Sequence, residues 1–264
     1  MRRVAGGGRR EAGRGLLAAL AIGVGVACSD LSGSSTSVLS IQFDTLAAPS
    51  VVVGDTLRDT TGAVIHPVVH AFNFKGDEIV PAPVFFLSPD SGVTVDSATG
   101  IVVGDSLRST PARIVAVVGN LQAIQRVNLT LRPDTLFGLN AFDSLFYSLA
   151  DTTRDLTQNP LTVKLSHGVS PTDSAVGSYI VSFAIISQPD PQLSELVNDA
   201  GFPSTVDTTD ASGIAGRKIR LHPLHLSSGT EVDSIVVNAT ARYRGAPVAG
   251  SPVRLVLLFK PGSQ

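Results

Sequence analysis

The histidines are the first side chains to consider for metal chemistry, because imidazole is the commonest protein ligand for transition metals. His66 and His70 are four positions apart, which in a strand would place both on one face. His222 and His225 are three apart and would point to opposite faces, and His167 stands alone. The sequence contains no C-x-x-C or H-E-x-x-H motif. We therefore expect strand or edge histidines and no transition-metal site.

Three aspartates are the remaining candidates for metal binding. Asp199, Asp207 and Asp210 lie close together in the sequence and could supply oxygen ligands for calcium. Their spacing matches no established calcium loop, so we expect neither a metal nor a cofactor. Asn128 and Asn238 begin formal glycosylation triplets, but both lie in predicted strands, and we expect neither to be modified.

Ser106 is the candidate for nucleophilic chemistry, because residues 101–107 (IVVGDSL) place it directly after an apolar segment. This string is similar to the nucleophile block of GDSL-type hydrolases, and the resemblance implies that Ser106 attacks an ester with a histidine as its base. However, the aspartate that this family has ahead of its histidine is missing before His222, and residues 51–58 (VVVGDTLR) nearly repeat the string. The family is also α/β, with this block at its start. We expect no catalytic residue, and a GDSL-like ester hydrolase is a remote alternative.

Cys28, the only cysteine, follows an arginine-rich start and an apolar run. The apolar run begins at Leu16, and small residues continue to Ala27. A charged region, a short apolar region and small residues are the parts of an export signal. The apolar run is shorter than the ~20 residues that a membrane-spanning helix needs. We therefore expect residues 1–27 to be a signal peptide that is removed.

Residues 25–28 (GVAC) resemble the lipobox of bacterial lipoproteins, which implies that Cys28 is acylated on sulfur and becomes the mature N-terminus. The family usually has leucine where Gly25 stands, so cleavage after Ala27 by ordinary signal peptidase is the alternative. Residues 28–37 then form a tether with a flexible, serine-rich composition. By resemblance to enterobacterial sorting, Ser29 directs the anchor to the outer membrane. We expect a lipid-anchored protein of the cell envelope, on a membrane face that the sequence leaves open.

The chain without its signal is acidic. The whole sequence has a formal net charge of −2, and the first 27 residues contain five arginines and a single glutamate. Their removal makes the charge more negative, which disfavours nucleic acid as a partner because that affinity depends on clustered lysine and arginine. With one cysteine there is no intramolecular disulfide, so the hydrophobic core must hold the fold.

The pattern of short segments predicts an all-β protein. Segments rich in Val, Ile, Thr and Phe alternate with clusters of Asp, Gly, Ser and Pro, and helical periodicity is nearly absent. We predict two tandem immunoglobulin-like β-sandwich domains at residues 38–132 and 133–260, followed by a tail at 261–264. The one helix-like segment is residues 192–198 (QLSELVN).

The first domain has eight predicted strands and a hairpin at Gly119-Asn120, and its strands are residues 38–43, 50–57, 64–74, 83–87, 93–96, 100–103, 112–118 and 121–131. Residues 53–56 (VGDT), 88–90 (SPD), 95–100 (VDSATG) and 112–116 (ARIVA) resemble, in this order, the motifs of the group 2 bacterial immunoglobulin-like domain. We expect Asp96 and Thr99 to bond turn amides, and Gly100 to take a backbone angle that other residues resist.

The second domain has predicted strands at residues 179–186, 234–244 and 253–259. Apolar and polar residues alternate in 234–244, which predicts one packed face and one wet face. The nearly continuous apolar segment 253–259 is expected at the centre of its sheet. Residues 209–215 (TDASGIA) resemble a junction of the group 1, invasin-like, immunoglobulin domains.

These observations favour a non-catalytic cell-envelope lipoprotein that presents immunoglobulin-like modules as a stalk or as a binding and adhesion surface. Its partners would be the membrane, through the lipid, and an unidentified protein or glycan. The alternative is a structural accessory subunit of an envelope complex. The chain has no tryptophan and three tyrosines, which argues against a deep carbohydrate cleft built from stacking rings.

Overall fold

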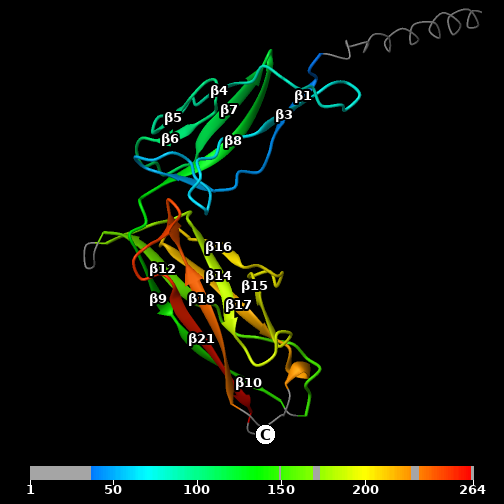
Figure 1. Cartoon of the computed structure of the whole chain (residues 1–264), viewed down its shortest axis with the longest axis vertical. Helices are drawn as coiled ribbons and strands as arrows, with labels where there is room; N and C mark the ends of the chain where they lie inside the picture. The colour runs from blue at the N-terminus through cyan, green and yellow to red at the C-terminus, as the bar shows by residue number, and fades with distance from the viewer. Residues whose placement is uncertain (1–36, 149, 169–172, 227–231, 263–264) are drawn as a thin grey trace, which may run out of the picture.

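The structure, a computed structural model, describes residues 37–148, 150–168, 173–226 and 232–262 (Figure 1). Strands β1–β8 form one part of the elongated molecule, here called the N-terminal unit, and β9–β21 form the other, the C-terminal unit. The described residues contain no α-helix and a single 3₁₀ turn. The predicted all-β class of tandem β-sandwiches is confirmed, whereas the boundaries predicted for the two domains remain predictions. None of the described residues forms a helix with the length and hydrophobicity to cross a membrane.

The N-terminal unit packs a four-stranded sheet, in the order β2-β8-β7-β4, against two strand pairs, β1-β3 and β5-β6. Val51, Ile114 and Val127 of the large sheet meet Val93 and Val102 of the β5-β6 pair in one buried cluster. Strand β2 runs parallel to β8, and the other pairings are antiparallel. The strands are β1 (Ser40–Phe43), β2 (Ser50–Val52), β3 (Val69–Phe72), β4 (Phe85–Leu87), β5 (Val93–Val95), β6 (Val102–Gly104), β7 (Ala112–Val118) and β8 (Leu121–Thr130).

The C-terminal unit is a sandwich of two sheets. One has five strands in the order β10-β21-β18-β14-β16. In the other, which has six, β12 pairs with β17, β9 and β13, and β17 also pairs with β11 and β15. Strand β21 lies between β10 and β18, so residues 253–259 form an interior strand, although the central strand of this sheet is β18. The elements are β9 (Thr135–Asn140), β10 (Phe142–Tyr147), β11 (Leu156–Thr157), β12 (Leu161–His167), β13 (Ser174–Ala175), β14 (Ile180–Ser187), β15 (Ser194–Val197), β16 (Val206–Thr208), β17 (Ile214–Leu221), η1 (Pro223–His225), β18 (Asp233–Thr240), β19 (Arg242–Tyr243), β20 (Ala246–Pro247) and β21 (Val253–Pro261).

The core of the C-terminal unit lies between its two sheets. Phe183, Ile235 and Leu257 of the five-stranded sheet pack against Val163 and Ile219 of the six-stranded sheet, and all five are almost completely buried. Full burial of one such side chain stabilises the fold by about 1.5–3 kcal/mol before entropy costs. These contacts, rather than a covalent cross-link, therefore hold the described part of the chain.

Two turns of the N-terminal unit form as the sequence predicts. The β7–β8 hairpin pairs Val118 with Leu121 across Gly119-Asn120, and Gly119 has a φ of 59°. In the β5–β6 turn, the carboxylate of Asp96 accepts hydrogen bonds from the amides of Ala98 and Thr99 at 3.1 and 2.7 Å. Gly100 there has a φ of 73°, which the absence of a Cβ permits.

The helix-like segment at residues 192–198 forms a strand instead of a helix. Ser194–Val197 is strand β15, which pairs antiparallel with β17 from Ser194 opposite Leu221 to Val197 opposite Lys218. Leu193, Leu196 and Val197 are buried in the sandwich. Pairing with β17 satisfies the backbone hydrogen-bonding groups of this segment. These hydrogen bonds stabilise the strand more than one or two turns of isolated helix would be stabilised, because so short a helix is marginal in water.

Several predicted strands are shorter or interrupted in the structure. Residues 50–57 contribute only β2, because Gly54, with a φ of 79°, turns the chain. Residues 64–74 contribute only β3, which begins after Pro67. The segment 234–244 divides into β18 and β19, and Val236 on its predicted wet face is buried.

Candidate functional site

Ser106 is not part of a catalytic arrangement in the described residues. It is exposed in the loop after β6, where its amide donates a hydrogen bond to the carbonyl of Gly92 at 3.2 Å. The histidine side chains with described polar partners contact other residues. Without a base in contact, a serine hydroxyl is a weak nucleophile.

One histidine of each pair contacts carboxylates. His70 in β3 contacts Glu78 through Nδ1 at 2.6 Å and Asp44 through Nε2 at 3.2 Å, and these hydrogen bonds raise the pKa of His70. His66 lies outside β3. Contrary to the expectation, His66 and His70 therefore do not share a strand face. His222, which directly precedes η1, contacts Asp155 at 2.8 Å.

The three loop aspartates are spread over different interactions. Asp199 contacts Lys218 at 3.1 Å, and Asp207 contacts Arg217 at 2.9 Å. Asp210 accepts hydrogen bonds from the amides of Ser212 and Ile214 in its own turn. The part of the chain that the structure describes has no group of three or more ligating side chains placed to hold a metal ion. Cys28 lies outside the described residues.

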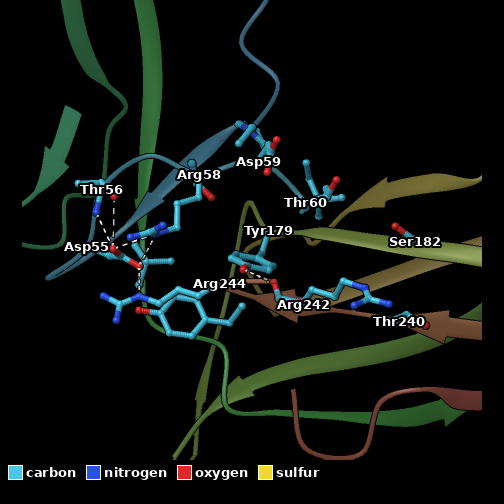
Figure 2. A pocket seen from close by; sticks show the side chains of 16 residues that line it. Asp55, Thr56, Arg58, Asp59, Thr60, Tyr179, Ser182, Thr240, Arg242 and Arg244 are labelled. Atoms are coloured by element: carbon cyan, nitrogen blue, oxygen red, sulfur yellow. Dashed lines mark hydrogen bonds and ion pairs between the residues drawn. The ribbon is translucent and has the colours of Figure 1, made fainter. Parts of the chain in front are cut away.

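A cavity of about 230 Å³ lies where the two units meet (Figure 2). The N-terminal unit contributes the segment that contains β2 and the turn after it, and the C-terminal unit contributes the starts of β14 and β19 with the end of β18. The polar side chains of the lining include Asp55, Arg58, Asp59, Thr60, Tyr179, Ser182, Thr240, Arg242, Tyr243 and Arg244.

Asp55 is the centre of the charge network beside this cavity. Its Oδ2 atom accepts a hydrogen bond from Nε of Arg244 in the C-terminal unit at 2.7 Å. Its Oδ1 atom accepts from the amide of Thr56 at 2.8 Å and from Nε of Arg58 at 3.1 Å. The Asp55 side chain is only 3% exposed, whereas that of Arg244 is 52% exposed. A buried carboxylate therefore joins the two units through an arginine that reaches solvent.

The electrostatics of this network favour ionised Asp55. Burial raises the pKa of Asp55, but hydrogen bonds from Arg244, Thr56, Tyr243 and Arg58 outweigh it and lower the pKa to about 2. Burial, with the nearby Tyr243 and Asp55, raises the pKa of the Tyr179 hydroxyl. Tyr179 therefore stays protonated and donates a hydrogen bond to the carbonyl of Arg242 at 2.6 Å.

The backbone at the junction takes conformations that side chains usually avoid. Within the described residues, Ser178 and Arg244 are the only non-glycine residues with positive φ, at 57° and 51°. Such conformations cost on the order of 1–3 kcal/mol and persist where surrounding contacts fix them. Ser178 accepts a hydrogen bond from Oγ of Ser50 at 2.6 Å, and Arg244 forms the ion pair with Asp55. Both strained residues thus form a bond across the junction.

Close backbone approach and one further bond complete the junction. A Cβ atom on Gly62 would collide with the backbone of Arg244 and Gly245, and one on Gly245 would come within 2.6 Å of the carbonyl oxygen of Thr61. Oγ1 of Thr130, at the end of β8, donates to the carbonyl of Gly177 at 2.7 Å. The two units are in direct contact along several segments.

Little in the amino-acid sequence marks this site. Residues 53–56 stand out only as the start of a motif for the fold, and Arg244 is the last residue of a predicted strand. Asp55 and Arg244 are 189 positions apart, and no periodicity links them. The usable signal is the cluster of arginines at 242 and 244 beside Gly245, at the end of an otherwise apolar strand.

Comparisons with known proteins identify no family. No family model matches the sequence, and no curated protein matches it. Among solved structures, domains 5–6 of the S-layer protein SbsC match with 13% identity and a TM-score of 0.29, over 86% of this chain and 99% of that one. Human protocadherin-24 EC1-2 matches with 14% identity and a TM-score of 0.27, over 86% and 100% of the two chains. TM-scores this low are no evidence of a shared function.

Proposed function

We propose that the protein is a non-catalytic cell-envelope lipoprotein in which two β-sandwich units form a stiff spacer, anchored through Cys28, that presents a binding surface. The observation that carries the proposal is the junction, where the buried carboxylate of Asp55 bonds Arg244 of the other unit at 2.7 Å. Flexible linkers between domains ordinarily allow relative motion. A junction with an ion pair, two side-chain hydrogen bonds and interlocked glycines restrains that motion.

The elongated arrangement supports the same proposal, because the two units are placed end to end rather than side by side (Figure 1). The N-terminal unit is the one next to the tether and its anchor, so the C-terminal unit would stand farther from the membrane. The partner of its surface would be a protein or a glycan, as an adhesion module or stalk requires.

The anchor is tested by labelling cells with a fatty acid and fractionating their membranes. We expect the unmodified chain to carry the label and to sediment with membranes, whereas Cys28→Ala loses the label and is released. Ser29→Ala serves as the matched control, because it changes a neighbour of the same tether without removing the thiol. Label that persists in Cys28→Ala, or its absence from the unmodified chain, would contradict the proposed anchor.

The proposed lack of hydrolase activity is tested separately. We expect the purified protein to hydrolyse no short-chain p-nitrophenyl ester above background. Hydrolysis that disappears in Ser106→Ala would instead support the GDSL-like alternative. Recovery of the protein in a stoichiometric membrane complex would favour an accessory subunit over an independent spacer.

A further inference from the structure

The cavity at the junction has the size of a site for one small chemical unit. Its volume of about 230 Å³ is below the ~300–1,000 Å³ of pockets that enclose drug-sized ligands. One sugar ring or one amino-acid side chain fits such a space, and a longer ligand would have to continue outside it. Because both units supply walls, the junction contacts also fix the shape of the cavity.

The negative charges at the cavity already have partners. Asp55 is bonded to Arg244 and Arg58. The Oδ1 atom of Asp59 accepts hydrogen bonds within its own turn, from the amides of Thr61 and Ala63 at 2.9 and 3.0 Å. The charge of Asp55 is balanced by its two arginines, whereas Asp59 keeps its negative charge on the exposed turn, with hydrogen bonds from neutral groups only.

Arg242 is the cation of the lining that has no carboxylate partner among the described ion pairs. Its Nη1 atom donates to the carbonyl of Gly245 at 3.0 Å, which leaves the other guanidinium donors for a ligand. A guanidinium presents a planar fork that matches a carboxylate with two parallel hydrogen bonds. The lining thus contains one anion receptor of defined geometry.

The groups around Arg242 suit a ligand that carries hydroxyls. Figure 2 shows the guanidinium of Arg242 near Ser182 and Thr240, which are opposite each other in the β14–β18 register. Thr60 lines the cavity from the N-terminal unit. These three hydroxyl side chains, each able to donate and accept, line the cavity together with the guanidinium.

The aromatic lining is concentrated here as well. Two of the chain's three tyrosines, Tyr179 and Tyr243, line the cavity. The guanidinium of Arg244 already lies 5.3 Å from the ring centre of Tyr243, so Tyr179 is the ring left to form an apolar wall. The scarcity of aromatic residues in the sequence thus does not exclude a shallow carbohydrate site at this place.

We propose that this cavity binds a carboxylate-bearing sugar residue, a uronic acid. Arg242 would pair with the carboxylate, Ser182, Thr240 and Thr60 would bond ring hydroxyls, and Tyr179 would pack against the ring. The site is independent of the lipid anchor, since it lies wholly within residues 48–244. Loss of the anchor in cells and loss of sugar binding in solution are therefore separate results.

The test is an NMR or calorimetric titration of the full chain lacking only its signal peptide. The ligands are glucuronate, glucose as the neutral analogue, and acetate as the carboxylate without the ring. We expect glucuronate to bind at least tenfold more tightly than either. Arg242→Ala should weaken glucuronate binding by about 10- to 100-fold, as expected for the loss of a charge-assisted pair.

The control is Arg254→Ala, which removes the same charge from an exposed position of β21 outside the cavity. It should leave binding unchanged, and both variants should melt at the temperature of the unmodified protein. Glucose binding as tight as that of glucuronate would overturn the role of the charge, and acetate binding as tight would overturn the role of the ring. Undetectable glucuronate binding, or an unchanged affinity in folded Arg242→Ala, would also overturn the proposal.

Discussion

Asp55 shows how one residue can join two separately packed units. Its carboxylate is buried, yet it remains ionised because a backbone amide and two arginines donate to it. Removal of one partner from a buried charge costs more than the pair contributes, because the other charge is left without compensation. Asp55 is therefore the residue at which a small change should have the largest effect on the junction.

Asp55→Asn should lower the free energy of unfolding by about 1–3 kcal/mol at pH 7, because two charged hydrogen bonds lose their acceptor charge. The pKa of Asp55 is lowered to about 2 in the folded protein, so its contribution is present above pH ~4 and disappears as the pH falls through 2. Urea denaturation at pH 7, 4 and 2.5 should show the difference between the variant and the unmodified protein decreasing with acidity.

The control for this measurement is Asp199→Asn. Its side chain is 89% exposed in an ion pair with Lys218, and surface pairs of this kind contribute about 0–1 kcal/mol. A loss of stability in Asp55→Asn no greater than that in Asp199→Asn would show that the Asp55–Arg244 bond does not hold the junction.

At the scale of elements, sequence reasoning succeeds where the determinants are local. The Asp96 turn and the Gly119-Asn120 hairpin follow from a few adjacent residues whose side chains or φ angles define the turn. Strand β7 is predicted with its exact bounds, because its apolar residues are continuous and are followed directly by the hairpin. These elements need no knowledge of the rest of the chain.

Prediction from sequence fails where an element depends on a partner that is distant in the chain. Strand β15 forms because β17 lies beside it, and nothing in residues 192–198 indicates that neighbour. The cavity is a stronger case, since Asp55 and Arg244 come together only when two units have folded and docked. The arginines at 242 and 244 mark one side of this contact, but no sequence pattern connects them with Asp55.

The turn after β2 offers a test of the docking between elements. Gly62→Ala should be more destabilising than Gly76→Ala, by at least about 1 kcal/mol, although both glycines have positive φ. The added Cβ at Gly62 collides with the backbone of Arg244 and Gly245, whereas the one at Gly76 has nothing within 4 Å. Thermal melts of the two variants give the comparison. Equal losses would mean that the β19–β20 turn moves away from Gly62 at little cost.

At the scale of the whole molecule, the junction decides whether the two units move as one body. Its contacts come from β2 and the turn after it, from the end of β8, and from the segments before β14 and after β19. Contacts at several separated points resist bending in more than one direction. The described geometry therefore predicts a narrow range of angles between the units.

Spin-label distances between the units test this expectation. With Cys28→Ser as background, labels at Ser109→Cys and Ser144→Cys report on exposed positions of the N-terminal and C-terminal units. We expect one narrow distance distribution, which broadens when Asp55→Asn and Arg244→Ala are combined and stays narrow in Arg254→Ala. A broad distribution before any change at the junction would contradict a stiff spacer.

In each unit an early strand runs parallel to the last one, β2 with β8 and β10 with β21. When a load pulls the two ends of a unit apart, parallel partners must slide lengthwise past each other. Their hydrogen bonds are then stretched together and cannot open one after another. If the protein is anchored to a surface at one end and bound to a partner at the other, this arrangement would resist unfolding under a sudden pulling force, independently of the affinity for the partner.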